Sequence, residues 1–331
     1  MNNKVVNLLS QMVDIESVTG NEKEIGNFLF GLLEDYGYRV SRQTVTQNRF
    51  NILAVKGKPR VLFCTHMDTV APHIQFSSEG ELLRGRGTCD AKGSMAAMIM
   101  AGEKLAVAGR EDIGYLFVAG EETNSDGAKM AAELGLETEY IILGEPTGNR
   151  VVSAQKGTLV FRVDVRGIAG HSALPSSGRS AVHKMAEVLN QWLETDWGSD
   201  TLRGETTLNI GTVSGGTAPN VIAPACKAQG IFRISTSVQE VKDKMKEGIA
   251  EDNDVSIDIL SSSEPLNLEE VPGLENTVVS FGSDAPYLTA LGKVVMCGPG
   301  SIKFAHSDDE QVTVPELLEG IEAYCRIASV L

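Results

Sequence analysis

Three short apolar runs, each followed at once by polar residues, constrain the fold of this 331-residue chain more than any other feature. The runs cover residues 61–64, 115–118 and 140–143 and continue into FCTHMD, FVAGEE and ILGEP, with helical patterns such as 95–108 between them. Such continuous apolar strands are typical of a mostly parallel α/β sheet that is covered on both faces. Open sheets of this class bind ligands at the carboxyl ends of their strands. Four polar side chains are therefore expected at one sheet edge: His66, Glu121, Glu122 and Glu145.

The segment TGNEKEIGNFLFGLLEDYG predicts an amphipathic helix with both ends marked. Thr19 and Glu22 fit a capping box at its start, and Gly37 follows its end. Apolar residues recur between them at helical spacing and predict one buried face: Ile25, Phe28, Leu29, Leu32 and Leu33.

The pattern changes after Lys156, where TLVFRVDVRG alternates strictly between apolar and polar residues and predicts a half-exposed strand. The elements that follow have the order of a ferredoxin-like βαββαβ unit: a helix at 180–193, strands at 206–213 and 226–235, a helix at 238–249 and a strand at 255–260. A buried strand at 293–297 and a helix at 314–330 then return to the first domain. We therefore expect a discontinuous domain made of 1–155 and 266–331, with a second domain, 156–265, inserted into it.

Charge and cysteine usage exclude several classes of protein. The chain has 29 Lys and Arg against 44 Asp and Glu, a net charge of −15, so nucleic acid and anionic membrane surfaces should be repelled. This charge could attract a cationic metabolite, but a solvated acidic surface explains it more simply. The five cysteines are widely spaced and form no C-x-x-C pair, which fits a reducing compartment. No signal-peptide pattern and no run of 18 apolar residues is present, so we expect a cytoplasmic protein with no membrane partner.

Several of the polar residues are of the types that zinc prefers, imidazole and carboxylate. His66 and Asp68 alternate within THMDT and should point to the same side, so that Asp68 can hold one imidazole nitrogen while the other binds a metal. Asp90 lies in the glycine-rich turn GRGTCDAKG, from which a carboxylate can project. Taken alone, Asp90 fits a helix N-cap equally well.

Two adjacent acids, Glu121 and Glu122, end a buried strand, and such a pair is costly unless cations compensate it. Glu145 before Pro146 and His306 in GPGSIKFAHSDDE complete the set. Each has a plain alternative, a solvated strand end for Glu145 and a surface loop for His306. Because all these residues follow strands or tight turns of one predicted sheet, the set as a whole predicts a metal site.

These motifs together resemble the dizinc hydrolase family that contains aminoacylases, acetylornithine deacetylase, succinyl-diaminopimelate desuccinylase and related carboxypeptidases, over essentially the whole chain. The resemblance implies a zinc-peptidase-like catalytic domain and an inserted lid and dimerisation domain. It implies two Zn²⁺ ions, for which Co²⁺ or Mn²⁺ can substitute. His66, Asp90 and Glu145 would hold one ion, and Glu122, His306 and the bridging Asp90 the other. Glu121 would be the general base, and Asp68, which holds the imidazole of His66, is expected to be a catalytic residue as well.

The inserted domain carries further matches to this family. In GIAGHSALPSSGRSA, His171 corresponds to a histidine that reaches the site of a neighbouring subunit, which implies a homodimer formed through the lid domains. A surface-loop histidine is the alternative. Asn220 in SGGTAPNVIAP and Arg233 in FRIS correspond to residues that contact the substrate and clamp its carboxylate, for which the guanidinium fork is suited. A surface ion pair is the alternative for Arg233.

The stretch FGSDAPYLTALGKVVMCGPGSIKFAHSDDE is most similar to acetylornithine deacetylase. It implies removal of an acetyl group from the small N-acyl amino acid N-acetylornithine, a step of arginine biosynthesis. Succinyl-diaminopimelate, acetyl-lysine, acetylcitrulline and dipeptides are the alternative substrates, and the family's acidic residue near the lid arginine is replaced in GIFRIS. A non-catalytic dimeric binding protein is the alternative from another class, but such a protein needs no general base. Glycine-rich turns at 85–87 and 298–300 lack the spacing of nucleotide-binding loops.

Overall fold

The computed structural model describes residues 2–249 and 253–331, which divide into two compact units. Unit 1 comprises the chain up to Ser153, Leu268–Thr277 and Ser283–Leu331, and unit 2 comprises Ala154–Asn267 and Val278–Gly282. The sequence placed the boundaries of the insertion at 156 and 265. It did not anticipate that the short segment Val278–Gly282 joins unit 2.

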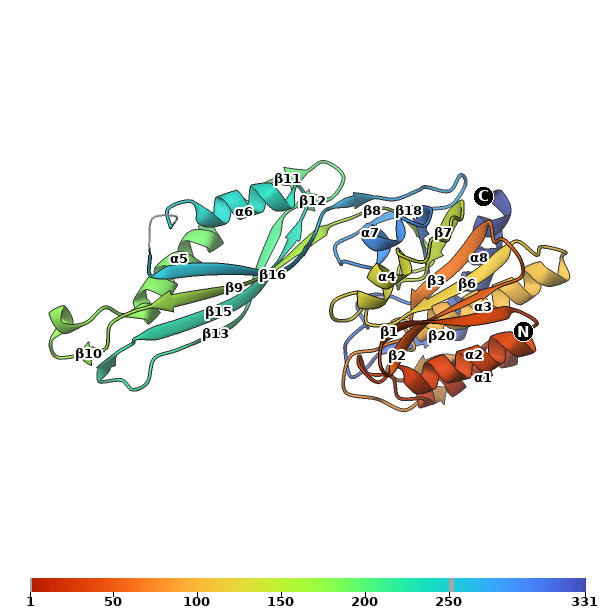
Figure 1. The fold of residues 1–331 in the computed structure, drawn as a ribbon, viewed down its shortest axis with the longest axis horizontal. Coiled ribbons are helices and arrows are strands. Elements are labelled where there is room, and N and C mark those ends of the chain that lie inside the picture. Colours follow the sequence, from red (N-terminus) through yellow and green to blue (C-terminus); the bar gives the residue numbers. More distant parts are fainter. Residues whose placement is uncertain (1, 250–252) are drawn as a thin grey trace. The chain divides into compact units, whose positions relative to one another are not determined.

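A twisted sheet with a parallel centre organises unit 1 (Figure 1). Its central strands β6, β3, β7 and β19 run parallel, and the flanking strands pair antiparallel. Its strands are, in spatial order, β1 (Arg39–Thr46), β2 (Arg49–Val55), β6 (Ile113–Val118), β3 (Val61–His66), β7 (Tyr140–Leu143), β19 (Lys293–Met296) and β8 (Val151–Gln155), with β18 (Asn276–Val279) beside β8. The short strand β17 (Leu266–Asn267) belongs to unit 2. Unit 1 also contains a small second sheet, with the strand order β20 (Gln311–Thr313), β5 (Leu82–Arg84) and β4 (Ser77–Glu79).

Helices cover both faces of the central strands, which is why β3 and β6 are buried at every position. On one face, Phe63 and Tyr115 join a core with four helices: α1 (Asn2–Asp14), α2 (Lys23–Asp35), α3 (Lys92–Val107) and α8 (Val314–Val330). The short helices α4 (Asp126–Ala131) and α7 (Ala285–Leu288) pack against each other, α4 on β1, β2 and β6 and α7 on β19. Within 2–249 and 253–331, no helix is both long and apolar enough to cross a lipid bilayer.

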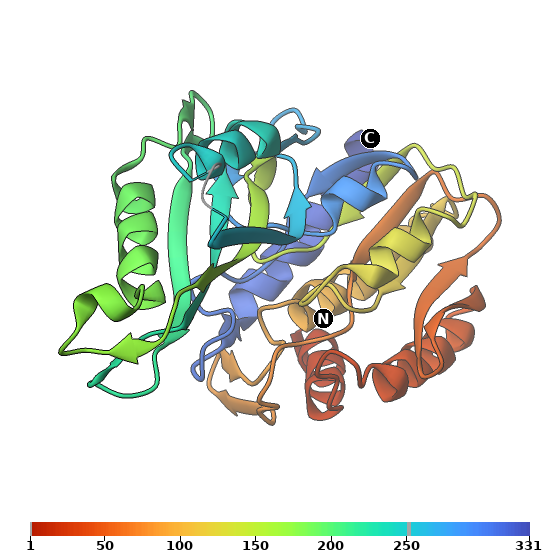
Figure 2. The same ribbon diagram turned by 60° about the vertical axis from the view of Figure 1, so that its left-hand side comes forward.

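Unit 2 has the expected ferredoxin-like order (Figure 2). Its elements are β9 (Gly157–Arg166), α5 (Ala181–Glu194), β13 (Thr207–Gly215), β15 (Ala225–Ile234), α6 (Val238–Lys246) and β16 (Val255–Ser263), and its antiparallel sheet has the order β13-β15-β9-β16. Phe161, Trp192 and Phe232 pack between the sheet and its helices, while β13 leaves most of its residues exposed. The smaller elements of this unit are β10 (Gly170–His171), the 3-10 turn Pro175–Ser177, β11 (Ser199–Asp200), β12 (Gly204–Glu205) and β14 (Val221–Ile222).

The predicted capping box before α2 is wrong. Glu22 occupies the N-cap position without a side-chain cap bond and pairs instead with Arg49, at 2.9 Å between Nη2 and Oε1. The hydroxyl of Thr19 donates to Asp68 Oδ2 at 2.7 Å. Both side chains thus find partners in distant parts of the chain, which outweigh the local cap. A capping box does occur at Thr313 and Glu316, where it begins α8.

Candidate metal centre

The predicted site residues of unit 1 lie where the central parallel strands end. His66 is the last residue of β3, Glu121 and Glu122 follow β6, and Glu145 follows β7. Because β3 pairs with both β6 and β7, these three ends meet at one edge of the sheet. The hydroxyl of Thr65 donates to the carbonyl of Gly144 at 2.8 Å and ties two of the ends together.

Asp90 lies between two histidines, His66 and His306, that are far apart in the sequence of unit 1. His66 Nε2 is 3.1 Å from Asp90 Oδ1, and His306 Nε2 is 3.5 Å from Asp90 Oδ2. His306 Nε2 is also 2.8 Å from Glu122 Oε2. His66, Asp90 and Glu122 each present one ligand atom, all within 4.8 Å of one another, as a metal site requires.

The ring of His66 is oriented through its other nitrogen. Nδ1 lies 2.9 Å from the backbone carbonyl of Asp68, and since a carbonyl only accepts, Nδ1 carries a proton. Nε2 is therefore the nitrogen that can bind a cation. The carboxylate of Asp68, to which the sequence assigned this orienting role, lies 3.5 Å from Nδ1 and faces the same nitrogen. Burial lowers the pKa of His66, and the hydrogen bonds to Asp68 and Asp90 outweigh it and raise the pKa well above its usual value.

The Asp68 carboxylate binds the turn that carries the two adjacent acids. Oδ1 accepts the backbone N–H groups of Gly120 at 2.9 Å and Glu121 at 3.1 Å, and Oδ2 accepts that of Glu122 at 3.2 Å. Burial raises the pKa of Asp68, but the bonds from His66, Thr19 and this turn lower it below its usual value. An anionic Asp68 thus holds Glu121 and Glu122 at the end of β6.

Glu145 is buried at this edge and Glu121 and Glu122 are partly buried, an accumulation of acids that is costly without cations. Glu145 is 4% exposed, and Oε1 of Glu145 and of Glu122 have no hydrogen-bond partner among the described residues. Burial raises the pKa of Glu121 and Glu145 well above the usual value; His66 opposes this, and neighbouring acids including Asp284 add to it. Orphaned buried carboxylates beside imidazole nitrogens are the donor set of a metal site, so these residues fit bound metal ions.

His306 stands in a left-handed backbone conformation, with φ of 61°. This conformation is uncommon for a residue with a side chain and concentrates at functional sites. The hydrogen bond to Glu122 raises the pKa of the half-exposed imidazole. His306 is therefore directed at Glu122 and Asp90 by a backbone that its loop must hold in place.

The three site residues predicted in unit 2 do not gather at one point. β10 pairs with β14, and the N–H of Ser172 donates to the carbonyl of Asn220 at 3.1 Å, so His171 and Asn220 are neighbours. His171 Nδ1 accepts the N–H of Ala173 at 3.1 Å, which leaves the proton on the exposed Nε2. Arg233 lies near the far end of β15, roughly 26 Å from that strand's first residue at about 3.3 Å per residue.

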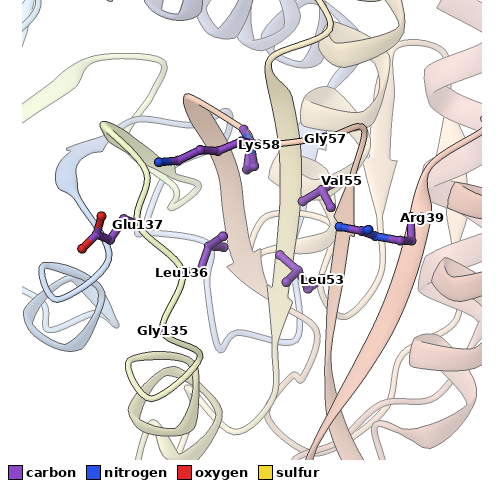
Figure 3. A pocket seen from close by; sticks show the side chains of 9 residues that line it. Arg39, Leu53, Val55, Gly57, Lys58, Gly135, Leu136 and Glu137 are labelled. Carbon is purple, nitrogen blue, oxygen red and sulfur yellow. The ribbon is translucent and has the colours of Figure 1, made fainter.

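A groove of about 480 Å³ lies at the opposite edge of the unit 1 sheet, where β3 and β7 begin (Figure 3). Leu53, Val55 and Leu136 form its apolar part, between the charged residues Arg39, Lys58 and Glu137. It contains none of the residues that the sequence predicted for the site.

Two charged residues close to the site were missed at the sequence level. Arg86 and Glu310 form a buried ion pair, with 2.6 Å between Nη1 and Oε2. Both stand in segments already singled out, GRGTCD and HSDDE, so their position beside Asp90 and His306 was the available signal. A buried Asp284, 1% exposed, was also missed; it precedes α7 in the D-A-P-Y motif.

Comparisons with known proteins identify the family of this chain. Residues 62–330 match the model of peptidase family M20/M25/M40. A peptidase M20 domain-containing protein of Schizosaccharomyces pombe is 36% identical over 98% of this chain and 84% of its own length. A probable carboxypeptidase of Aspergillus flavus is 33% identical over 96% and 85%. The crystal structure of a Staphylococcus aureus tripeptidase has the same fold, with a TM-score of 0.84 at 20% identity over 100% of this chain and 98% of that one. The chain thus belongs to peptidase family M20/M25/M40 and is a hydrolase of amide or peptide bonds.

Proposed function

We propose that this chain is a two-metal amidohydrolase that removes a short acyl group from the nitrogen of an amino acid. The observation that carries the proposal is the position of Asp90, whose two carboxylate oxygens face His66 and His306 separately. A carboxylate that offers one oxygen to each of two metal ions has this geometry. The sequence resemblance to dizinc deacylases supports the same assignment.

In this proposal His66, Asp90 and Glu145 hold one metal ion, and Glu122, His306 and Asp90 hold the other. Zn²⁺ fits imidazole and carboxylate ligands, and Co²⁺ or Mn²⁺ can replace it. Ions held by these residues would supply Lewis-acid chemistry: they would polarise the scissile carbonyl and make the attacking water easier to deprotonate.

Glu121 is the proposed general base. Its carboxyl group is buried and its pKa is raised by that burial, which favours a group that takes a proton and gives it up again. It takes the proton of the attacking water and delivers it to the leaving nitrogen. Asp68 keeps Glu121 in place through the backbone of the turn.

The residues of unit 2 are proposed to bind the substrate. Arg233, near the last residue of β15, clamps the carboxylate of the amino acid, and Asn220, beside His171, contacts the substrate as well. The exposed Nε2–H of His171 donates to the oxyanion in the site of a neighbouring subunit of a homodimer. Its tautomer, set by the N–H of Ala173, supports this role.

N-acetylornithine is the first substrate that we propose, on the resemblance of residues 281–310 to acetylornithine deacetylase. A peptide with a free carboxyl terminus is the second candidate. The names of the relatives favour it, since a probable carboxypeptidase and a tripeptidase are among them. Both candidates require the same metal centre and the same general base.

Amine release by the metal-loaded protein tests the proposal. The panel contains N-acetylornithine, N-acetyl-lysine, N-acetylcitrulline, N-succinyl-diaminopimelate, a dipeptide and a tripeptide. We expect N-acetylornithine to have the highest kcat/KM, and its carboxamide analogue to be at least about tenfold worse because Arg233 loses its carboxylate partner. Preference for a peptide or a succinylated substrate would replace the acetylornithine assignment, equal rates for acid and amide would exclude the clamp, and no turnover of any amide would contradict the proposed function.

A further inference from the structure

A buried ion pair connects the loop that carries Asp90 to the loop that carries His306. Arg86 Nη1 and Glu310 Oε2 are 2.6 Å apart, and each side chain is 1% exposed. Arg86 is four residues before Asp90, and Glu310 is four residues after His306. The pair therefore joins two segments that are more than 200 residues apart in the sequence.

The second oxygen of Glu310 binds the backbone of the Asp90 loop. Oε1 accepts the N–H groups of Gly87 at 2.9 Å, Cys89 at 3.1 Å and Asp90 at 3.0 Å. These three donors converge because the loop turns tightly at Gly87, whose φ is 89° and where a Cβ would lie 2.9 Å from Thr69 Cγ2. Converging N–H groups of this kind form a concave binding site for an anion, and here the anion is the Glu310 carboxylate.

Arg86 extends the connection to the other loop. Its Nη1 donates to the carbonyl of Ser307, directly after His306, at 3.0 Å, and its Nε donates to the carbonyl of Pro72 at 3.2 Å. A buried ion pair is stable only when its remaining hydrogen-bonding groups are satisfied, and both members meet this condition with backbone groups of the site loops. The charged groups of Arg86 and Glu310 thus bind backbone groups of the loops that carry Asp90 and His306.

We infer that Arg86 and Glu310 are positioning residues that hold Asp90 and His306 at the separation that two metal ions require. This inference rests on the proposed metal centre. Neither residue contacts the ions or the substrate in this role. The Arg86–Glu310 pair acts through the amide of Asp90 and the carbonyl of Ser307. Loss of the pair should therefore change the geometry of the metal ligands and leave their chemistry intact.

Two double variants separate positioning from charge. Arg86→Met with Glu310→Gln removes both charges but keeps an amide oxygen for the three N–H groups, whereas Arg86→Met with Glu310→Met removes that acceptor as well. Glu310→Asp, which keeps the charge but shortens the side chain, is a milder third variant. Glu322→Gln, which breaks the exposed pair with Lys104, is the control.

Two measurements are made on each protein: Co²⁺ affinity by chelator competition, with the Co²⁺ absorption spectrum, and amide hydrogen exchange of residues 87–90 in the metal-free protein. We expect the Met/Met variant (Arg86→Met with Glu310→Met) to bind Co²⁺ at least about tenfold more weakly than the Met/Gln variant (Arg86→Met with Glu310→Gln) and to exchange these amides faster. Glu310→Asp should lie between these two variants, and Glu322→Gln should behave as the wild type. Wild-type affinity, spectrum and exchange in the Met/Met variant, or in Glu310→Asp if the Met/Met variant does not fold, would overturn the inference. If the wild type binds no Co²⁺, the proposed metal centre fails. In that case the hydrogen exchange of residues 87–90 alone decides whether Arg86 and Glu310 hold the loop of Asp90. Equal exchange rates in the wild type and all variants would reject the inference.

Discussion

Asp90 is the residue on which both halves of the candidate centre depend. Its two oxygens face different histidines, so a single truncation removes a ligand from each proposed ion. We predict that Asp90→Ala lowers the content of both metals, whereas Asp112→Ala, which removes a surface acid paired with Arg110, leaves it unchanged. Metal analysis after dialysis measures this. Two tightly bound ions per chain in Asp90→Ala would rule out the bridging role.

Glu121 and Glu122 are neighbours with different proposed roles. Glu122 lies 2.8 Å from His306 Nε2, whereas Glu121 is assigned to proton transfer. We predict that Glu121→Gln keeps its metals and loses about 10²- to 10⁴-fold in kcat, because an amide cannot shuttle the proton. Glu122→Gln is the matched control, and it should lose metal affinity first. A loss of metal from Glu121→Gln would make Glu121 a ligand instead.

At the scale of elements, the turn after β6 depends on one carboxylate from the segment after β3. Asp68 accepts three consecutive backbone N–H groups of this turn and the hydroxyl of Thr19. We predict that Asp68→Ala destabilises the fold by roughly 2–4 kcal/mol, because buried donors are left without an acceptor, and that it also lowers kcat/KM.

Thr19→Val separates the two effects of Asp68. It removes one hydroxyl donor and leaves the turn bonded, so it should cost about 1 kcal/mol and leave kcat unchanged. Urea unfolding and steady-state kinetics measure both quantities. Equal kinetic losses in the two variants would show that the turn does not depend on the carboxylate.

At the scale of the whole molecule, the buried acids make stability depend on pH. Burial raises the pKa of Asp284 from 3.8 to about 7, a shift worth roughly 4 kcal/mol. Between these values the folded state binds more protons than the unfolded state, so stability falls as pH rises. The raised pKa values of Glu121 and Glu145 act in the same direction.

We therefore predict that the metal-free protein is less stable at pH 8 than at pH 5. The metal-loaded protein should show a smaller loss, since cations compensate the acids. Asp284→Asn should flatten the dependence of the metal-free protein, whereas Asp258→Asn, in an exposed pair of unit 2, should not. Urea unfolding at both pH values measures the difference. A metal-free protein that gains stability from pH 5 to 8 would contradict the assignment.

Assembly is the second property of the whole molecule. Unit 2 exposes several large apolar side chains: Ile168, Leu174, Val213 and Leu260. If His171 completes the site of a neighbour, mixing inactive His171→Ala and Glu121→Gln subunits should restore activity, because one site of each mixed dimer has both residues intact. Tagged co-purification establishes that mixed dimers form. Mixed dimers without activity would exclude the shared site.

The sequence by itself determined the buried central strands, the order of elements in unit 2 and the residue types that line the candidate centre. Apolar runs and strict alternation depend only on neighbouring residues, so β3, β6, β7 and β9 could be located within a few residues. The resemblance identified the family, and the residue types predicted a metal. These properties are encoded over short stretches of chain, which is why they could be read before any packing was known.

Only the tertiary structure decided which groups these residues contact. Thr19 bonds to Asp68, 49 residues away, instead of capping α2, and Arg86 pairs with Glu310, 224 residues away. It also decided that Asn220 lies beside His171, whereas Arg233 stands near the last residue of β15. A buried polar group takes the best partner that packing brings to it, and that partner comes from any part of the chain. Local pattern therefore determined which side chains are present at the sheet edge, and packing determined how they are held there.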